Sequence, residues 1–304
     1  MRPRRGADRA GRALLRLGIG DDAAVLRPLG PNQELLITTD FLVEDSHFDR
    51  FRHPVRALGH KTLARGLSDI AAMGGEPLYF LLSLCLPGWF DENCQKQFFA
   101  GMFQLAGSHR LTLIGGDLSA GERLAADVVV LGSARRGRTL ERGRAEVGDT
   151  IYVSGRLGGS ALGLERLNRG GRLKDPAVRR HLYLTPRLAL GRYLAGRLGV
   201  RAAMDLSDGL SIDLYRLAAE SRVGAEIRLA DIPVFPGATV EQALHGGEDY
   251  ELLFTLNPRR KAPASFEGLP LTAIGSVTAG RRLTLIGTGG RRPPLPIRGF
   301  QHSV

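Results

Sequence analysis

The hydrophobic pattern of residues 60–77 predicts an amphipathic helix with a sharp end. Its apolar residues recur at the i, i+4, i+7 spacing of one helical face: Leu63, Leu67 and Ile70. Two glycines and a proline then end the pattern. Asp69 is unusual, because it lies at the edge of the apolar face in the last two turns, where the helix dipole disfavours negative charge. This segment alone leaves two alternatives open: the carboxylate holds a cation, or it faces solvent or pairs with Arg65.

Apolar runs on both sides of this helix predict strands. The strands fall at residues 34–39, 78–86, 111–117 and 127–134, with a second helix at residues 91–108. The run at 78–86 is apolar throughout, so we expect both faces of that strand to be covered. Together these elements predict one α+β unit in which helices pack on a sheet.

A polar, Arg-rich and Gly-punctuated stretch at residues 135–148 predicts a domain boundary. The chain of 304 residues exceeds the usual size of a single domain. We therefore expect an α/β (α+β) protein of two domains, residues 1–140 and 141–304.

The second half also combines strands and helices. Strands are expected at 150–154 and 252–256, and helices at 176–198, interrupted at Pro186, and from Leu210 onward. The segment 281–304 is rich in Pro, Gly and Arg, which predicts an irregular surface chain.

Composition limits the cellular context. Apolar residues make up 43% of the chain, enough for a large core, yet no apolar run approaches the roughly 20 residues that span a bilayer. The basic start of the chain lacks the apolar centre of a secretory signal, so we expect a cytoplasmic protein with no membrane partner. The two cysteines, Cys85 and Cys94, show neither metal-ligand nor disulfide-framework spacing and are expected to be buried free thiols.

A net charge of +11 raises the question of nucleic-acid binding. The basic residues are nearly all Arg and are scattered along the chain, with local runs at residues 2–16 and 135–144. Aromatic residues, on which bases stack, make up only 6% of the chain. An Arg bias in composition or an anionic small-molecule ligand explains the charge as well, so we expect no nucleic-acid partner.

Acidic residues, in contrast, gather in short segments beside Gly, Ser or Thr. These segments are Asp21-Asp22, Thr38-Thr39-Asp40, Gly115-Gly116-Asp117, Asp205-Leu206-Ser207-Asp208 and Gly247-Glu248-Asp249-Tyr250-Glu251. Neighbouring carboxylates repel each other unless a cation or hydrogen-bond donors compensate them, and carboxylate and hydroxyl oxygens are hard ligands of the kind that Mg²⁺ prefers. Each segment is a weak signal by itself, but together they predict a site in which several divalent metals offset a polyphosphate.

Structural explanations stay open for several of these residues. Asp21-Asp22 also fits a solvated turn, and Ser207 with Asp208 also fits the cap of the helix that carries Leu210. A loop histidine such as His47 is by itself more typical of a structural or solvated residue than of a functional one. The Gly-rich turn at residues 155–160 matches neither the Walker A nor the dinucleotide-binding pattern.

Six motifs, in their order and spacing, resemble the thiamine-monophosphate kinase family of the PurM-like (aminoimidazole ribonucleotide synthetase-like) superfamily. They are GIGDDAAVL, TTDFLVEDSHF, LSDIAAMGGEP, LIGGD, DLSDGLSIDL and GGEDYEL, and the resemblance extends from about Gly18 to Phe300. It implies a two-domain PurM-like fold, in which the N-terminal α/β domain forms a β-barrel with a second copy in a homodimer and the C-terminal α/β domain completes a nucleotide cleft. It also implies an enzyme that transfers a phosphoryl group from ATP to thiamine monophosphate, giving thiamine diphosphate and ADP.

Carried over position by position, the resemblance implies three sets of site residues. Mg²⁺ is expected at Asp22, Thr38, Thr39, Asp40, Asp69, Asp117, Asp205 and Asp208. ATP is expected at Gly116, Asp117, Arg142 and Ser207. Thiamine monophosphate is expected at His47, Glu248 and Phe300. The chain departs from the family pattern at Gly66, usually Asn, and at Leu118, usually Thr.

No catalytic general base is expected. The acceptor is a phosphate monoester whose second pKa of about 6 leaves it largely ionised at neutral pH. The obstacle is repulsion between two phosphates, so transfer depends on positioning and charge neutralisation. We expect metal-bound Asp residues to neutralise this charge, with Arg142 adding positive charge. Two alternatives stay open: another PurM-like ATP-dependent enzyme such as aminoimidazole ribonucleotide synthetase, or a non-catalytic polyanion-binding protein.

Overall fold

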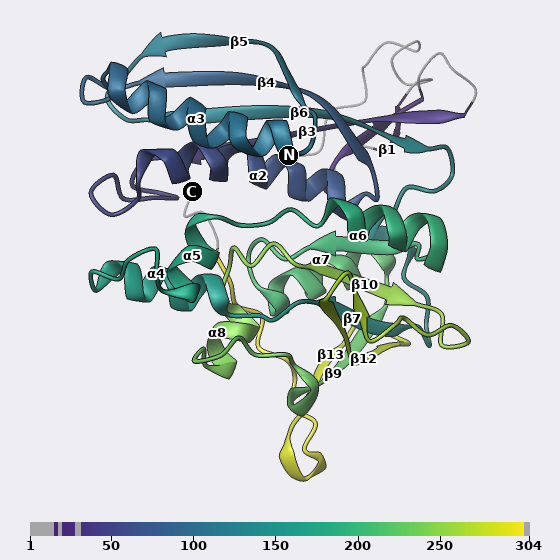
Figure 1. Ribbon diagram of the computed structural model, residues 1–304. Coiled ribbons are helices and arrows are strands. Elements are labelled where there is room, and N and C mark those ends of the chain that lie inside the picture. The colour runs from purple at the N-terminus through teal and green to yellow at the C-terminus, as the bar shows by residue number, and fades with distance from the viewer. Residues whose placement is uncertain (1–14, 18–19, 28–31, 301–304) are drawn as a thin grey trace.

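A computed structural model describes residues 15–17, 20–27 and 32–300. Within these residues the chain forms two α/β halves, one above the other in Figure 1. The expected start of the family resemblance at Gly18 and most of the basic run at residues 2–16 lie outside the described residues. No helix of the described part is long and apolar enough to cross a membrane.

The first half is a six-stranded sheet with two helices on one face. Its strands have the spatial order β1-β2-β3-β6-β4-β5, and β4 and β5 are parallel while the other neighbours are antiparallel. The strands are β1 (Leu15–Leu17), β2 (Ala24–Leu26), β3 (Gln33–Val43), β4 (Glu76–Leu86), β5 (Thr112–Ala120) and β6 (Ala125–Arg135), and the helices are α2 (Val55–Ala72) and α3 (Glu92–Ser108). The predicted helices and strands of this half are all present, with longer bounds for most strands.

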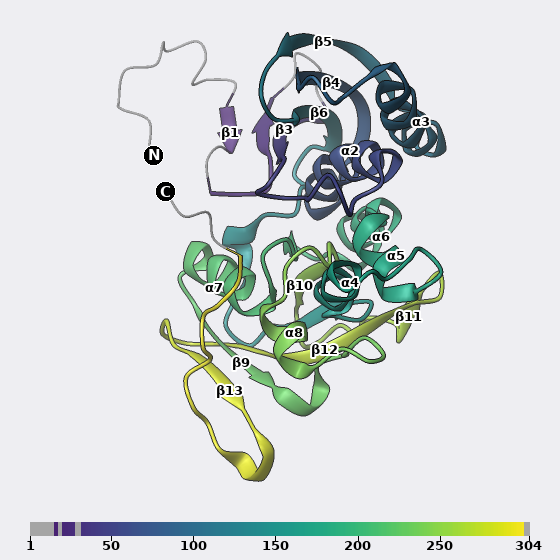
Figure 2. The same ribbon diagram turned by 90° about the vertical axis from the view of Figure 1, so that its left-hand side faces the viewer.

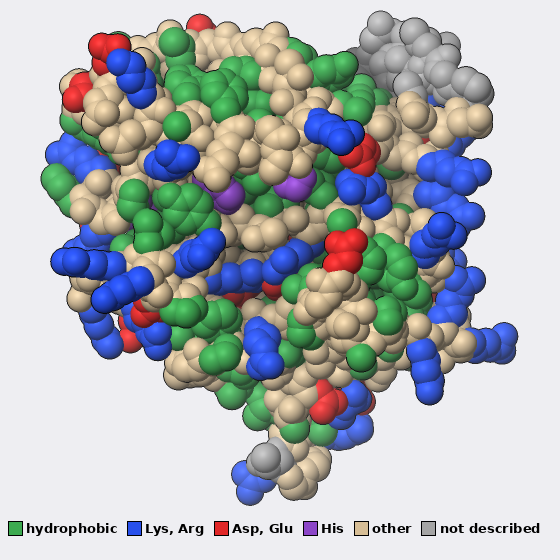
Figure 3. All heavy atoms as spheres, viewed as in Figure 1, with side chains coloured by type: hydrophobic (Ala, Val, Ile, Leu, Met, Phe, Trp, Pro, Cys, Tyr) green, Lys and Arg blue, Asp and Glu red, His purple; other side chains and the backbone are tan. Residues whose placement is uncertain are grey.

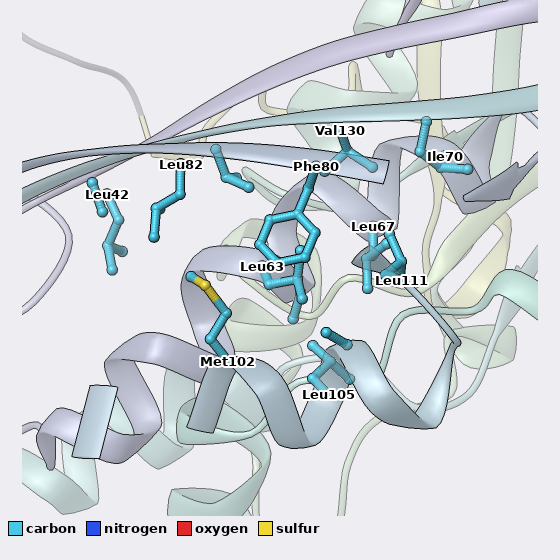
Figure 4. Close-up of a cluster of buried hydrophobic side chains, with 14 of the residues drawn as sticks. Leu42, Leu63, Leu67, Ile70, Phe80, Leu82, Met102, Leu105, Leu111 and Val130 are labelled. Carbon is cyan, nitrogen blue, oxygen red and sulfur yellow. The ribbon is translucent and has the colours of Figure 1, made fainter. Parts of the chain in front are cut away.

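Buried apolar side chains fill the layer between this sheet and its helices. Phe80 from β4, Leu63 from α2 and Met102 from α3 are fully buried in one cluster (Figure 4). Burying each such side chain stabilises the fold by about 1.5–3 kcal/mol. The i, i+4, i+7 pattern of α2 is therefore the side of the helix that faces the sheet.

The opposite face of the six-stranded sheet is left partly exposed. In β4, Phe80 and Leu82 are buried, whereas Tyr79 is 47% exposed, and Phe41 of β3 is 52% exposed. Figure 1 shows both helices on the other side of the sheet. The expectation that both faces of residues 78–86 are covered is wrong for the described chain. An apolar sequence indicates that both faces of a strand avoid water, but it does not show whether the same chain or another one covers them.

The second half is a seven-stranded sheet of order β13-β9-β12-β7-β10-β8, with β11 paired to β12. Its strands are β7 (Thr150–Ser154), β8 (Ala202–Asp205), β9 (Gly224–Arg228), β10 (Leu252–Leu256), β11 (Ser265–Phe266), β12 (Leu269–Thr278) and β13 (Leu283–Ile286). Its helices are α4 (Gly159–Asn168), α5 (Pro176–Leu182), α6 (Leu188–Tyr193), a π-helical turn η2 (Leu194–Leu198), α7 (Leu210–Ser221) and α8 (Val240–His245). Short 3₁₀ segments are η1 (Arg142–Arg144), η3 (Leu229–Asp231) and η4 (Thr288–Gly290).

Both faces of the seven-stranded sheet carry a core. Leu253 of β10 packs in one cluster with Leu214 of α7, and the neighbouring Phe254 packs in another with Leu190 of α6. The predicted interruption at Pro186 is confirmed, since α5 ends before it and α6 begins after it. The expectation of irregular chain at 281–304 is wrong for β13, which pairs in parallel with β9.

The two cysteines are free and only half-buried, so the expectation of buried thiols is met in part.

Helix α2 joins the two halves. Its C-terminal end is so close to α6 that a Cβ atom on Gly191 would lie 2.0 Å from the carbonyl oxygen of Ala71. Leu184, Leu188 and Tyr250, all from the second half, belong to the core cluster of the first. Figure 2 shows α5 and α6 of the second half directly below α2. A site between the halves is therefore built on a fixed junction.

Candidate active site

A cavity of about 400 Å³ lies at the junction of the two halves. Histidine side chains reach the surface between the halves in Figure 3. Most of the residues predicted from the sequence line the cavity, namely Thr39, Asp40, His47, Asp69, Arg142, Asp205, Ser207, Asp208, Glu248 and Phe300. Asp22 and Thr38 lie directly behind this lining, since Asp22 binds Arg142 and the Thr38 hydroxyl donates to Asp69.

Three carboxylates from distant segments meet at one end of the cavity. Asp22 precedes β2, Asp69 lies in the last turn of α2, and Asp205 ends β8. One oxygen of each lies within 4.8 Å of the others. The Ser68 hydroxyl donates a 2.6 Å hydrogen bond to Asp205, so α2 supports two members of this acidic cluster.

The acidic cluster is electrostatically strained. Burial raises the pKa of Asp69 well above its usual range, and repulsion from Asp205, Asp40 and Asp22 raises it further. Burial likewise raises the pKa of Asp205 well above its usual range, with Asp22 as the next cause. Two buried carboxylates, from Asp22 and Asp205, and the half-buried carboxylate of Asp69 repel each other. They form the donor set that a hard divalent cation satisfies.

Arg142 supplies positive charge to the acidic cluster. Its guanidinium binds both oxygens of Asp22, with Nε at 2.9 Å and Nη2 at 2.6 Å. The neighbouring Asp21 takes a different role, because its carboxylate accepts the backbone N–H of Arg142 at 2.8 Å. Burial, followed by repulsion from Asp22, raises the pKa of Asp21 to about 8. The adjacent pair Asp21-Asp22 is therefore not a solvated turn.

Arg65 pairs with Asp40 and not with Asp69. The Arg65 guanidinium lies 2.7 Å from a carboxylate oxygen of Asp40, and the side chain lines the cavity. The alternative in which Asp69 pairs with Arg65 is therefore wrong. The Thr39 hydroxyl turns toward the exposed face of the sheet, where it donates to Asp127 at 2.6 Å.

Glu248 lies at another part of the cavity wall. Lys61 Nζ is 2.8 Å from its Oε2, and His181 Nδ1 is 3.4 Å from the same oxygen. Burial alone would raise the pKa of Glu248, but attraction from Lys61, then from His181 and Arg65, lowers it to about 2. Glu248 therefore carries a negative charge at every pH near neutrality.

His47 and Phe300 bring flat rings to the same cavity. Their ring centroids are 6.1 Å apart, and the backbone N–H of Phe300 donates to the carbonyl oxygen of Asp208 at 3.1 Å. The C-terminal segment is thus held next to the predicted metal-binding motif at the start of α7.

The alternative in which Ser207 and Asp208 cap α7 is wrong. Neither Ser207 nor Asp208 caps the helix, whose N-cap is Gly209 without a side-chain hydrogen bond. Asp213 inside the helix accepts the backbone N–H groups of Asp208 and Gly209, both at 3.0 Å. A carboxylate within the first turn replaces the cap, and this leaves Ser207 and Asp208 on the cavity wall.

The Gly-rich turn at residues 155–160 holds an anion from its own chain. The Asp249 carboxylate accepts the backbone N–H groups of Gly158 at 2.5 Å and Ser160 at 3.1 Å. Glu251 is also bound internally, by Arg180, Arg187 and Ser154. Of the three acids in GGEDYEL, Glu248 alone lines the cavity.

Gly116 and Asp117 are not brought to this cavity. They lie on β5, the edge strand that β4 and β6 separate from β3, and both are exposed. A Cβ atom at Gly116 would lie 1.8 Å from the Leu82 carbonyl oxygen, so the close pairing of β5 with β4 requires this glycine. Within one described chain both residues lie away from the cavity, and their contact with the nucleotide stays a prediction.

Four residues of the site were not predicted from the sequence: Lys61, Arg65, Ser68 and His181. The first three recur at i, i+4, i+7 on α2, so a search for polar as well as apolar periodicity detects them. His181 on α5 has no such signal in the sequence, because its partners come from other segments.

Comparison with known proteins shows which family shares this architecture. The family models for AIR synthase related protein match in both parts, the N-terminal domain at residues 20–134 and the C-terminal domain at residues 146–288. Thiamine-monophosphate kinase of Haemophilus influenzae is 38% identical over 279 residues, which cover 86% of this chain and 83% of that protein. The Bacillus subtilis enzyme of the same name is 36% identical, with 86% and 85% covered.

Solved structures show the same similarity. The structure of AaThiL complexed with AMPPCP and TMP has a TM-score of 0.84 at 33% identity, covering 94% of this chain and 92% of that chain. Thiamine-monophosphate kinase from Stenotrophomonas maltophilia has a TM-score of 0.79 at 37% identity, covering 93% and 94%.

Two matched domains around an acidic cavity define an AIR synthase related protein, which confirms the predicted two-domain PurM-like fold of mixed α/β content. Within that class, the chain belongs to the thiamine-monophosphate kinase family. The six-stranded sheet of the described chain is open, so the predicted β-barrel is not formed by one chain.

Proposed function

We propose that this protein phosphorylates thiamine monophosphate with ATP, giving thiamine diphosphate and ADP. The observation that carries the proposal is the acidic cluster of Asp22, Asp69 and Asp205 at the end of a cavity between two family-defining domains. The relatives named thiamine-monophosphate kinase and the structure of AaThiL complexed with AMPPCP and TMP support the same pair of substrates.

We infer that the acidic cluster binds Mg²⁺. Asp22, Asp69 and Asp205 would hold the metal, and we propose Thr38, Asp40 and Asp208, which lie at or directly behind the same cavity wall, for further sites. Thr39 stays a proposed ligand only through a change of its rotamer, because its hydroxyl donates to Asp127. The raised pKa values of Asp69 and Asp205 support this inference, since a cation relieves the repulsion that causes them. When bound, Mg²⁺ offsets the negative charge of the phosphates.

The rest of the cavity suits the organic part of thiamine monophosphate. Its thiazolium ring is a cation, and Glu248 offers a carboxylate that stays ionised because its pKa is about 2. The rings of His47 and Phe300 offer flat surfaces against which aromatic heterocycles pack. Arg142 and Ser207 line the cavity beside the acidic cluster, where nucleotide phosphates would lie.

The chain's own residues orient two phosphates and neutralise their repulsion. The acceptor phosphate is already ionised near neutral pH, so no side chain has to remove a proton from it. An in-line transfer through a loose transition state depends on positioning and electrostatic stabilisation. The guanidinium of Arg142 lies next to Asp22, in the acidic cluster that would hold the metal. It is therefore suited to stabilise the negative charge that moves between the phosphates.

We also propose a homodimer that uses the exposed face of the six-stranded sheet. This face carries large apolar side chains, including Phe41, Tyr79 and Ile114. Two such curved sheets, face to face, would close the predicted β-barrel. Asp117, which cannot reach the cavity of its own chain, would then serve the nucleotide of the second copy, together with Gly116.

We further propose a domain boundary between residues 140 and 141 and a cytoplasmic location. The boundary between residues 140 and 141 falls in the stretch 135–145 that neither family model covers. A cytoplasmic location suits an enzyme that consumes ATP. On the face shown in Figure 3, Lys and Arg side chains are scattered and do not gather into one patch.

The deciding experiment supplies the purified protein with Mg²⁺-ATP and either thiamine monophosphate or a precursor of aminoimidazole ribonucleotide. We expect thiamine diphosphate and ADP to form in equal amounts, and no ADP with the ribonucleotide. ADP formation only with the ribonucleotide would assign the chain to the alternative enzyme.

A further inference from the structure

We propose that Lys61 is a positioning residue for the acceptor substrate, which fixes the carboxylate of Glu248 at the cavity wall. This inference rests on the proposed function, in which Glu248 contacts thiamine monophosphate. It adds a residue from the first half of the chain to a substrate contact made by the second half.

Lys61 is buried, and its ammonium group contacts the carboxylate of Glu248. Its side chain is 1% exposed and lies on the face of α2 that meets the second half. Nζ approaches Glu248 Oε2 at 2.8 Å. A lysine that loses its hydration needs such a partner, because an unpaired buried ammonium is costly.

A second polar group lies near the same oxygen. His181 lies 3.4 Å from Glu248 Oε2, and its ring is held by the hydroxyl of Ser160 at 3.0 Å and by His53 at 3.1 Å. Glu248 Oε1, in contrast, receives no hydrogen bond from any other residue in the described ranges. One oxygen is thus anchored from behind, while the residue still lines the cavity and is free to offer the other oxygen to a ligand.

The backbone around Glu248 explains why an anchor is needed. Glu248 has a φ of 66° and Tyr250 a φ of 48°, both in the left-handed region that non-glycine residues rarely adopt. The backbone N–H of Glu248 donates to the Ser207 carbonyl oxygen at 2.7 Å. Strain of this kind persists only where the surroundings determine the conformation, and it concentrates at ligand sites. A buried ion pair contributes little net stability, so stability alone is a weak reason for Lys61 at this position.

Several charged and titratable groups face Glu248, and they affect how its protonation depends on pH. They are Lys61 and Arg65 of α2, Asp40 of β3, His181 of α5, and His53 and Tyr250 from the adjoining loops. With Lys61 in place, Glu248 stays ionised across the working range. Without Lys61, burial raises the pKa of Glu248, so its carboxyl binds a proton as the pH falls.

The test compares Lys61→Met with the wild type. We expect KM for thiamine monophosphate to rise about tenfold or more, with KM for ATP and kcat within about twofold, since binding of one substrate is lost. We also expect the variant's KM, relative to the wild type at each pH, to improve as the pH rises from 6 to 8.5. Lys61→Arg should restore part of the loss.

A double variant shows whether Lys61 acts through Glu248. If it does, Lys61→Met adds no more than about twofold to the KM increase of Glu248→Gln, because coupled residues are not additive. Met102→Ala is the control for stability alone, since it opens a cavity against the other side of α2. It should lower Tm without changing either KM.

Three results would overturn the proposal: additive effects in the double variant, equal changes in both KM values, or a lowered Tm with both KM values unchanged, as expected for Met102→Ala. Should Lys61→Met fail to fold, Lys61→Arg and Glu248→Gln carry the same comparison. Calorimetric binding of thiamine monophosphate to each variant is independent of turnover. A wild type that binds thiamine monophosphate but forms no thiamine diphosphate would refute the proposed function and leave this inference testable.

Discussion

Two buried histidines at the junction of the halves share one hydrogen bond. His53 and His181 are 3% and 1% exposed, and their Nε2 atoms lie 3.1 Å apart. Only one of these atoms carries a proton when both rings are neutral. Burial, followed by repulsion from Lys61, lowers the pKa of His53 to about 4 and that of His181 to about 3. Protonating both rings would point two N–H groups at each other.

This pair predicts a loss of stability in mild acid. The unfolded chain takes up protons near the ordinary histidine pKa of about 6.5, whereas the folded chain does not, so stability falls as the pH drops below 6.5. At pH 5.5 each histidine costs about 1.4 kcal/mol relative to pH 7.5. Denaturant unfolding at the two pH values measures this, and a His53→Gln/His181→Gln variant should lose less. An unchanged pH dependence in that variant would contradict the assignment.

The acidic cluster predicts opposite effects on turnover and stability. Asp69→Asn or Asp205→Asn removes one charge from three repelling carboxylates, so metal-free stability should stay equal or rise. Turnover should fall about 10²-fold or more, because charge neutralisation at the phosphates is lost. Asp231→Asn, at an exposed pair with Arg228, is the matched control. Near-normal turnover in both cluster variants would remove the metal site from the proposal.

At the residue scale, the sequence predicted the acidic members of the site better than their supports. Asp69 was predicted because the helix dipole disfavours a carboxylate near a helix C-terminus unless a cation compensates its charge. Lys61 and His181 did not stand out, because the burial that makes them unusual comes from packing between halves. The sequence left capping by Ser207 open, and the structure excludes it because the carboxylate of Asp213, one turn inside the helix, binds the backbone N–H groups at its start.

Helices α2 and α3 touch at their backbones. A Cβ atom on Gly101 would lie 1.9 Å from the carbonyl oxygen of Arg56, and one on Gly59 would lie 1.8 Å from that of Phe98. The two helices can approach this closely only because both positions lack a side chain. The contact places α2, and with it Asp69, against the sheet.

Substitution in α3 tests this contact. Gly101→Ala should destabilise the protein by about 2–3 kcal/mol, because the helices must separate. Gly107→Ala lies in the same helix with nothing within 4 Å of the new Cβ, so it should stabilise by about 0.5 kcal/mol through helix propensity. Denaturant unfolding of both variants measures the difference. Equal effects would show that the helices move apart without cost.

At the element scale, periodicity and turn residues predicted the longer helices and six of the thirteen described strands, because these signals are local. The short strands β8, β9 and β11 and the longer β12 were not predicted. β13 was missed because Pro- and Gly-rich flanks conceal a short strand whose partner, β9, lies about 60 residues earlier along the chain. Strand order in both sheets had no sequence signal either, since pairing depends on contacts between distant segments.

The exposed sheet face predicts the assembly state of the molecule. Tyr79→Arg places a charge on this face, at a side chain that is 47% exposed in the single chain. We expect the wild type to sediment as a dimer and this variant as a monomer with reduced turnover. Arg110, also on the first half but outside the sheet, offers Arg110→Ala as a control that stays dimeric. A monomeric wild type would refute the homodimer.

Mixed dimers test where Asp117 acts. Asp117→Asn and Asp69→Asn should each be inactive. Co-expressed, they should regain about a quarter of wild-type turnover, since half of the dimers are mixed and each mixed dimer has one site with both carboxylates intact. No recovery would mean that Asp117 serves its own chain or none.

The close contact of α6 with α2 sets a mechanical limit on the molecule. Gly191 and Ala71 leave no space between the backbones, and His60 of α2 also binds the carbonyl oxygen of Leu184 at 2.8 Å. A motion that separates the two halves at this point would have to break this contact. We therefore expect the cavity between the halves to keep its shape at this side when a ligand binds, so that selectivity depends more on the shape of its walls than on separation and closure of the halves.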